Sequence, residues 1–239
     1  MYITVLAVVL RAENYRDNDK MLTLFSGEKG KIEALSRGCR KQGSHLAAAS
    51  EPFVCSEMQL YEKNGRYTLT QAVVKDDFYE MRSDLDRFYC GSILLAAAER
   101  CTVPESPDRR VFALLINCLY GLTKGADPMD VLLFFSFRLM YALGQGLSLG
   151  NCIYCMEPSV VKIDFDHGGC VCADCQGGVE FSERFISILR LIYSSGVKDI
   201  ADAVYGADRS ETLKFLRYAF DTVNIGHIKA VDYFDDEHR

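Results

Sequence analysis

Two cysteine pairs of the form C-x2-C, Cys152–Cys155 and Cys172–Cys175, constrain this 239-residue chain more than any other feature. The sixteen residues 156–171 separate the pairs. This spacing is typical of two tight turns that supply four thiolates to one tetrahedral zinc ion. Glycines lead into and out of the second pair, and glycine readily takes the positive φ that such turns demand. We therefore predict one structural zinc ion per chain, with Cys152, Cys155, Cys172 and Cys175 as its ligands.

Three alternatives to this site stay open at this point. Cys170 could replace Cys172 as a ligand, although that would break the second C-x2-C spacing. His167 could create a mixed site, although a histidine beside two glycines is more typical of an exposed loop. The thiols could also be ordinary packed cysteines or one redox pair. A shell of four sulfurs leaves no open position for water or substrate, so the predicted zinc is structural rather than catalytic.

The overall charge limits what kind of partner the whole molecule attracts. The net charge is −6, so contact with nucleic acid has to come from a local basic patch. The other cysteines read as small apolar residues, which suits a reducing compartment. The N-terminus lacks the basic region of a secretory signal, and the apolar run 131–143 is short and contains Arg138. We expect a cytoplasmic protein with no membrane span.

Residues 1–80 carry the pattern of a small β domain. Short runs rich in strand-forming residues lie between turn residues, at 1–10, 21–25, 31–35, 53–61 and 66–74. Asn64-Gly65 between the last two runs is a strong hairpin signal. Five strands with one long loop, residues 36–52, predict a five-stranded OB-type β-barrel, with a fragment of a β-sandwich as the alternative.

From residue 81 the apolar residues follow a helical period. The clearest stripe is Val111, Leu114, Leu115, Cys118, Leu119 and Leu122. We predict that helices begin at Asp84, Pro107, Asp127-Pro128, Ser182 and Ser210, which cap helices or occupy their first position. The predicted fold class is α+β: an OB domain over residues 1–80, then a helical domain over 81–239, with a four-cysteine zinc finger inserted at 150–178.

One stretch is strongly basic within this acidic chain. Between residues 29 and 41, five cations stand against one acid, Glu33. OB barrels bind single strands through a basic groove and aromatic stacking platforms. We predict phosphate contacts from Lys29, Lys31, Arg37, Arg40 and Lys41. Tyr15, Phe25 and Tyr67 are candidate stacking residues, although core packing explains each of them as well. If this segment does not bind DNA, the next choice is the helical surface around Lys198, Arg209 and Lys214.

The sequence also carries a resemblance to a known family. The run VVLRAENYRDNDKMLTLFSGEKGKI (residues 8–32) and the run SRGCRK (residues 36–41) resemble the start of RecO, a bacterial recombination mediator family. The segment with the two cysteine pairs is similar to the zinc-binding segment of many RecO proteins. The likeness extends over essentially the whole chain, and the parts come in the family order.

This resemblance implies a function and a set of partners. It implies binding of single- and double-stranded DNA and ATP-independent annealing of complementary strands in repair and recombination, without enzymatic activity. It further implies RecR and the acidic C-terminal tail of single-stranded DNA-binding protein (SSB) as partners, loading of RecA onto SSB-coated DNA, and association with the nucleoid.

Two other functional classes remain as alternatives. One is a zinc-ribbon and OB accessory protein of transcription or translation, and the other is an enzyme, either a dithiol catalyst or a zinc hydrolase. The residues themselves argue against nucleotide use. A P-loop ending at Gly30-Lys31 would need glycine at position 25 and Ser or Thr at position 32, where the chain has Phe25 and Ile32.

Overall fold

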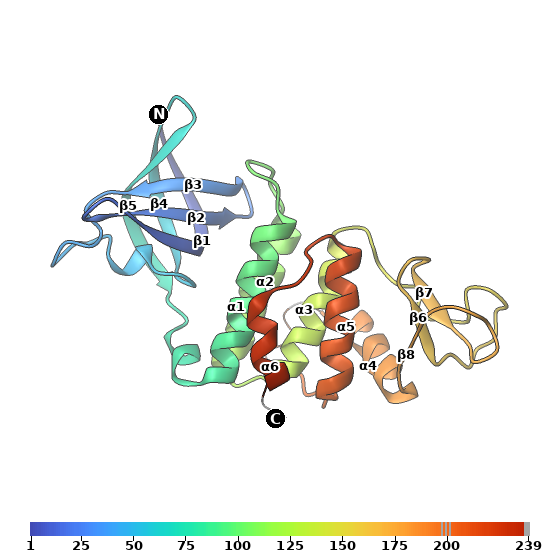
Figure 1. Ribbon diagram of the computed structural model, residues 1–239. Coiled ribbons are helices and arrows are strands. Elements are labelled where there is room, and N and C mark those ends of the chain that lie inside the picture. Colours follow the sequence, from blue (N-terminus) through green and yellow to red (C-terminus); the bar gives the residue numbers. More distant parts are fainter. Residues whose placement is uncertain (197, 199, 201, 237–239) are drawn as a thin grey trace. The chain divides into compact units, whose positions relative to one another are not determined.

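The computed structural model describes residues 1–196, 198, 200 and 202–236 (Figure 1). The chain divides into two compact units. The first consists of Met1–Asp84 and Leu95–Leu115, and the second of Leu85–Leu94 and Ile116–Arg239. Among the described residues, no helix combines the length and the apolar character needed to cross a membrane.

The first unit is built around a closed five-stranded barrel, as the sequence predicts. Its strands follow the order β1-β2-β3-β5-β4. Neighbouring strands are antiparallel except for β3 and β5, which pair in parallel and close the barrel. The strands are β1 (Tyr2–Tyr15), β2 (Asp19–Ser26), β3 (Gly30–Ser36), β4 (Cys55–Lys63) and β5 (Arg66–Asp76).

Alternating side chains explain why these segments close into a barrel. In β1, Val5, Ala7 and Val9 are buried, whereas Tyr2 and Leu6 are exposed. Successive side chains of a strand point to opposite faces, so one face of each strand supplies the core. Twelve buried residues fill the interior: Val5, Ala7, Val9, Leu22, Leu24, Ile32, Ala34, Cys39, Leu46, Met58, Leu60 and Leu69.

Two glycines fix turns that determine the barrel's register. Asn64 and Gly65 have φ values of 53° and 72°, so the predicted hairpin between β4 and β5 is present with both turn residues left-handed. Gly30 begins β3 with a φ of 71°, and a Cβ there would lie 2.2 Å from the carbonyl oxygen of Ser106. Only glycine therefore allows residues 104–106 to approach this strand.

The segment Leu95–Leu115 packs on the barrel within the same unit. The ring of Phe112 meets the fully buried Phe25 edge-on, with 5.7 Å between centroids. The backbone N–H of Glu105 donates to the carbonyl oxygen of Lys31 at 3.0 Å. The core of the first unit thus includes helical residues that the sequence analysis assigns to the helical domain, residues 81–239.

The helices begin close to the predicted positions, with two corrections. Asp127 and Ser182 cap helices as predicted. The helix predicted to begin at Pro107 begins at Arg109, because Asp108 accepts the free N–H groups of its first turn. The predicted cap Ser210 is replaced by Asp208. The helices are α1 (Leu85–Cys101), α2 (Arg109–Lys124), α3 (Pro128–Ala142), α4 (Glu183–Ser194), α5 (Arg209–Thr222) and α6 (Asp232–Asp236).

A small three-stranded sheet stands between α3 and α4 in the sequence. Its strands are β6 (Lys162–Asp164), β7 (Gly169–Val171) and β8 (Val179–Glu180), in the order β7-β6-β8. Phe165, which follows β6, stacks on Tyr218 of α5 at 5.2 Å and contacts Phe215 at 5.5 Å. These aromatic contacts attach the sheet to the helices of the second unit.

Candidate metal centre and nucleic-acid interface

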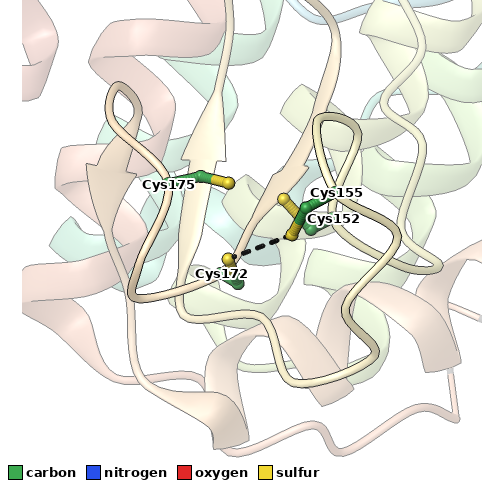
Figure 2. A group of neighbouring side chains, drawn as sticks. All are labelled: Cys152, Cys155, Cys172 and Cys175. Atoms are coloured by element: carbon green, nitrogen blue, oxygen red, sulfur yellow. Dashed lines mark hydrogen bonds between the residues drawn. The ribbon is translucent and has the colours of Figure 1, made fainter.

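The first cysteine pair lies in a tight turn closed by backbone hydrogen bonds. The N–H of Met156 donates to the carbonyl oxygen of Cys152 at 2.9 Å, and the N–H of Cys152 donates to that of Glu157 at 2.8 Å. Met156 takes a left-handed φ of 66°. This turn presents the thiols of Cys152 and Cys155 on the same side (Figure 2).

The second pair follows β7 and is held by a lysine of β6. Lys162 Nζ donates to the carbonyl oxygens of Ala173 at 3.1 Å and Cys175 at 2.6 Å. Gly178 leads the chain away with a φ of 78°, and a Cβ there would lie 3.1 Å from a carbonyl oxygen of β6. The sequence predicts glycine at such a turn, but it does not reveal the role of Lys162.

The two turns bring all four predicted sulfur ligands together. The Sγ atoms of Cys152, Cys155, Cys172 and Cys175 all lie within 4.8 Å of one another and face a common centre (Figure 2). The Cys155 and Cys172 sulfurs are 3.6 Å apart. A tetrahedral zinc ion with bonds of about 2.3 Å would place its sulfurs about 3.8 Å apart. The four residues therefore fit a metal ion of zinc's size and preference for thiolates.

The protonation of the four thiols is uneven. Burial raises the pKa of the Cys152 thiol, but backbone N–H groups of Cys172, Cys155 and Tyr154 outweigh it and lower this pKa to about 6. Hydrogen bonds to the thiols of Cys155 and Cys172, with some burial, raise the pKa of Cys175 to about 12. Thiolates this close repel one another, so a bound cation is needed to hold all four deprotonated.

Neither alternative ligand joins this cluster within the described part of the chain. Cys170 lies on β7, fully buried, and burial raises the pKa of its thiol to about 11. His167 Nδ1 lies 3.0 Å from Asp164 Oδ2 and 3.1 Å from the Tyr154 hydroxyl. That hydroxyl donates to the same Asp164 oxygen at 2.7 Å. The histidine thus belongs to a polar network that links the first turn to β6, which the sequence does not predict.

Strand β3 divides the five cations predicted to contact phosphate into two groups. Lys29 and Lys31 lie at its start, and Arg37, Arg40 and Lys41 follow its end. Seven residues at about 3.3 Å each put roughly 20 Å between the ends. The linear stretch of basic residues therefore does not form one patch.

The group after β3 is fastened to the turn between β1 and β2. Asp19 Oδ1 accepts the backbone N–H of Gly38 at 2.7 Å. The backbone N–H of Arg40 donates to the carbonyl oxygen of Asn18 at 3.0 Å, and its Nη1 donates to that of Asp17 at 3.2 Å. The two segments held together by these bonds surround a concavity of about 420 Å³. It is lined by Arg16, Asp17, Asn18, Asp19, Arg37, Gly38 and Lys41.

The group at the start of β3 has a different environment. Lys31 Nζ donates to the carbonyl oxygen of Glu99 at 2.6 Å, and Arg11 Nε pairs with the Glu99 carboxylate at 3.1 Å. A groove of about 580 Å³ runs beside them and also exposes the carboxylates of Glu33 and Glu105. Lys31 thus lies among acids, and the neighbouring Lys29 is exposed in the preceding turn.

The three candidate stacking residues also differ in accessibility. Phe25 is fully buried in the first unit and serves its core. Tyr67 is half-buried beside the carboxylate groove, where burial and then Glu105 raise the pKa of its hydroxyl. Tyr15 is 38% exposed and carries the guanidinium of Arg16 over its ring, 5.2 Å from the centroid. Tyr15 is the most exposed of the three and lies next to Arg16, which lines the basic concavity.

The chain is similar to a known family over both of its parts. The model described as "Recombination protein O N terminal" matches residues 1–78, and the one described as "Recombination protein O C terminal" matches residues 82–224.

Individual relatives agree with this match. The protein named "DNA repair protein RecO" from Caldicellulosiruptor saccharolyticus is 27% identical over 238 residues, which cover 98% of each chain. The protein of the same name from Alkaliphilus metalliredigens is 32% identical over 185 residues, covering 76% of this chain and 75% of the relative. Another from Acetivibrio thermocellus is 28% identical over 206 residues, covering 83% of this chain and 82% of the relative.

Proposed function

This chain belongs to the RecO family of DNA repair and recombination proteins, and from that premise we propose that it binds DNA and anneals complementary strands without ATP. The observation that carries the proposal is a closed OB-type barrel with a cationic concavity at one end, in a chain that matches the family over both parts. OB barrels bind single strands by combining such charges with exposed aromatic rings.

The proposal assigns different work to the parts of the chain. The barrel domain, residues 1–80, binds DNA, with Arg37, Arg40 and Lys41 as principal phosphate contacts and Lys29 and Lys31 as weaker ones. The helical domain, residues 81–239, provides docking sites for RecR and for the acidic SSB tail. Together these contacts deliver RecA to SSB-coated DNA. The closed barrel and the separate helical second unit support this division of labour.

We propose that the ion at the four-cysteine cluster is zinc and that its role is structural. Four thiolates saturate a tetrahedral ion and leave no position for substrate, so zinc here would supply folding energy to the finger, residues 150–178. Cys152, Cys155, Cys172 and Cys175 would hold it, one ion per chain. This closed ligand set and the lack of a P-loop sequence support a mediator that does not catalyse a reaction.

An annealing assay tests the function directly. Complementary oligonucleotides, bare or coated with SSB, are mixed with the purified protein in the absence of nucleotide, and duplex formation is followed by energy transfer between end labels. We expect annealing without ATP in both cases. Annealing that strictly requires ATP, or no DNA binding at all, would refute the proposal; the second result would favour an accessory protein of transcription or translation.

A further inference from the structure

We propose that the concavity between the β1–β2 turn and the residues after β3 binds a phosphodiester of single-stranded nucleic acid. In this site Arg16 acts beside Arg37 and Lys41, and Asp19 is a positioning residue. The inference rests on the proposed DNA binding, and it deepens that function by naming a site and two residues that the basic sequence run does not contain.

The shape of the concavity supports a specific site rather than a diffuse patch. Its volume is about 420 Å³, and cations line it from two segments of the chain that are distant in sequence. Arg16 comes from the β1–β2 turn, and Arg37 and Lys41 come from the segment after β3. Three cations around one hollow can surround a single phosphate, whereas cations along one strand cannot.

The local charge favours an anion despite two neighbouring acids. Residues 16–19 and 37–41 carry four cations and two carboxylates, so their net charge is +2. One carboxylate, Asp19, is already engaged, because its Oδ1 accepts the backbone N–H of Gly38 at 2.7 Å. This bond fixes the residues after β3 against the β1–β2 turn, so Asp19 sets the distance between Arg37 and Arg16.

Arg16 is held in place by its own conformation and by a neighbour. Its φ of 54° lies in the left-handed region, which few non-glycine residues occupy. The guanidinium lies over the ring of Tyr15, 5.2 Å from the centroid. A cation held over an aromatic ring keeps its N–H groups free at the edge of the guanidinium plane, where they can donate to phosphate oxygens.

The hairpin between β4 and β5 provides a matched control. Lys63 is exposed at the end of β4 and is not among the residues that line the concavity. Replacing Lys63 or Arg16 by alanine removes one exposed positive charge in either case. A purely long-range effect of net charge would be similar for the two variants, whereas a phosphate site requires Arg16 alone.

The first experiment measures binding of a labelled oligo-dT by fluorescence anisotropy at several salt concentrations. One lost phosphate contact on a single strand should lower the salt slope by about 0.7 and weaken binding about fivefold at 0.1 M salt. We expect this change for Arg16→Ala and a much smaller one for Lys63→Ala. Arg16→Gly should behave like Arg16→Ala, and because glycine tolerates the positive φ, its loss of binding cannot come from a damaged turn.

A second pair of variants tests the positioning role of Asp19. Asparagine and alanine both remove the negative charge, but only asparagine keeps an oxygen that can accept the N–H of Gly38. We expect Asp19→Asn to bind at least as tightly as wild type, with the same salt slope. Asp19→Ala should bind several-fold more weakly than Asp19→Asn, with a smaller slope. Equal binding by the two variants would overturn the positioning role.

The outcomes separate this inference from the proposed function. If wild type binds no DNA, the function itself fails. If wild type binds and Arg16→Ala matches Lys63→Ala in affinity and slope, the function stands and this site is wrong. An anionic vesicle of phosphatidylglycerol provides a further arm: loss of vesicle binding in Arg16→Ala with unchanged oligo-dT binding would assign the concavity to lipid phosphate and overturn the inference.

Discussion

The barrel and the cysteine-bearing sheet reach order by opposite means. The barrel strands are seven to fourteen residues long, close on one another through backbone hydrogen bonds and enclose twelve buried core residues. The sheet β6–β8 has strands of two or three residues, and the turn before β6 and the turn between β7 and β8 carry four sulfurs around one centre. A sheet this short buries little by itself.

The difference shows where each region is vulnerable. The barrel is stabilised by its packed apolar core. Its stability should therefore change little when one polar contact is lost but should fall when a cavity is created in the core. If the sheet depends on the proposed zinc ion and on its aromatic contact with α5, its stability should change little with small apolar substitutions but fall on loss of a ligand.

Loss of a sulfur ligand should have the largest effect. In Cys155→Ser and Cys172→Ser we expect zinc content to fall together with the stability of residues 150–180, because the ion's binding energy is part of folding. Metal analysis and hydrogen exchange would measure both, and the barrel amides should remain protected. Full zinc retention in both variants would refute the four-cysteine site. Cys101→Ser is a control, since Cys101 lies outside the cluster.

Acid should release the metal. Zinc binding requires thiolates, so affinity falls as pH falls, by up to tenfold per pH unit for each proton that the ion must displace. The pKa of Cys152 in the metal-free cluster is about 6. Above pH 6 the Cys152 thiol is already ionised. Below pH 6 zinc must also displace the proton of this thiol, so the zinc affinity should fall more steeply as the pH decreases. A chelator titration between pH 5 and 8 would measure it; a pH-independent affinity would contradict the cluster.

A cavity in the barrel core should destabilise the barrel without changing the zinc content. Met58 is fully buried in the barrel core, so Met58→Ala should cost about 2–5 kcal/mol of unfolding free energy. Zinc content should stay at the wild-type value. Met156 provides a control, because it lies in the first cysteine turn and is 67% exposed. Met156→Ala should change stability by less than about 0.5 kcal/mol. Denaturant unfolding of the two variants would decide the matter.

The smallest effect on stability should come from the basic residues after β3. Replacing Arg37, Arg40 and Lys41 together by alanine should leave zinc content and melting temperature near wild type, because these side chains are exposed. Binding to all single strands should weaken similarly, and the salt slope should flatten by about two units if all three touch phosphate. Unchanged affinity and slope would move the DNA surface elsewhere, with Lys198, Arg209 and Lys214 as the next variants to test.

The sequence predicts features that neighbouring residues determine, and it misses features that strand length and strand pairing determine. The hairpin at Asn64-Gly65, the cap at Ser182 and the convergence of the four cysteines follow from nearby residues and are confirmed. The division of the basic run by β3 does not follow from counting charges, because the length of that strand separates Lys31 from Arg37.

Roles that depend on distant partners are equally hidden in the sequence. Lys162 reaches the carbonyl oxygen of Cys175 only because β6 and β7 pair. Arg16 and Lys41 line the same concavity only because β2 pairs with β3. Two helix starts differ for a simpler reason: Asp108 caps α2, so this helix begins after the predicted first residue Pro107, and Asp208 caps α5 in place of Ser210. The domain boundaries at residues 80 and 81 stay a prediction.

The stacking of Phe165 on Tyr218 has a consequence for the growing chain. Every barrel strand has been synthesised by residue 76, so the barrel can close while most of the polypeptide has yet to leave the ribosome. The finger has all four cysteines by residue 175, but its aromatic partners on α5 arrive only with residues 215 and 218. We expect a truncated chain that ends at residue 185, free of the ribosome, to resist protease over the barrel and to be cleaved between residues 150 and 180. Resistance of the finger at that length would show that metal alone completes it.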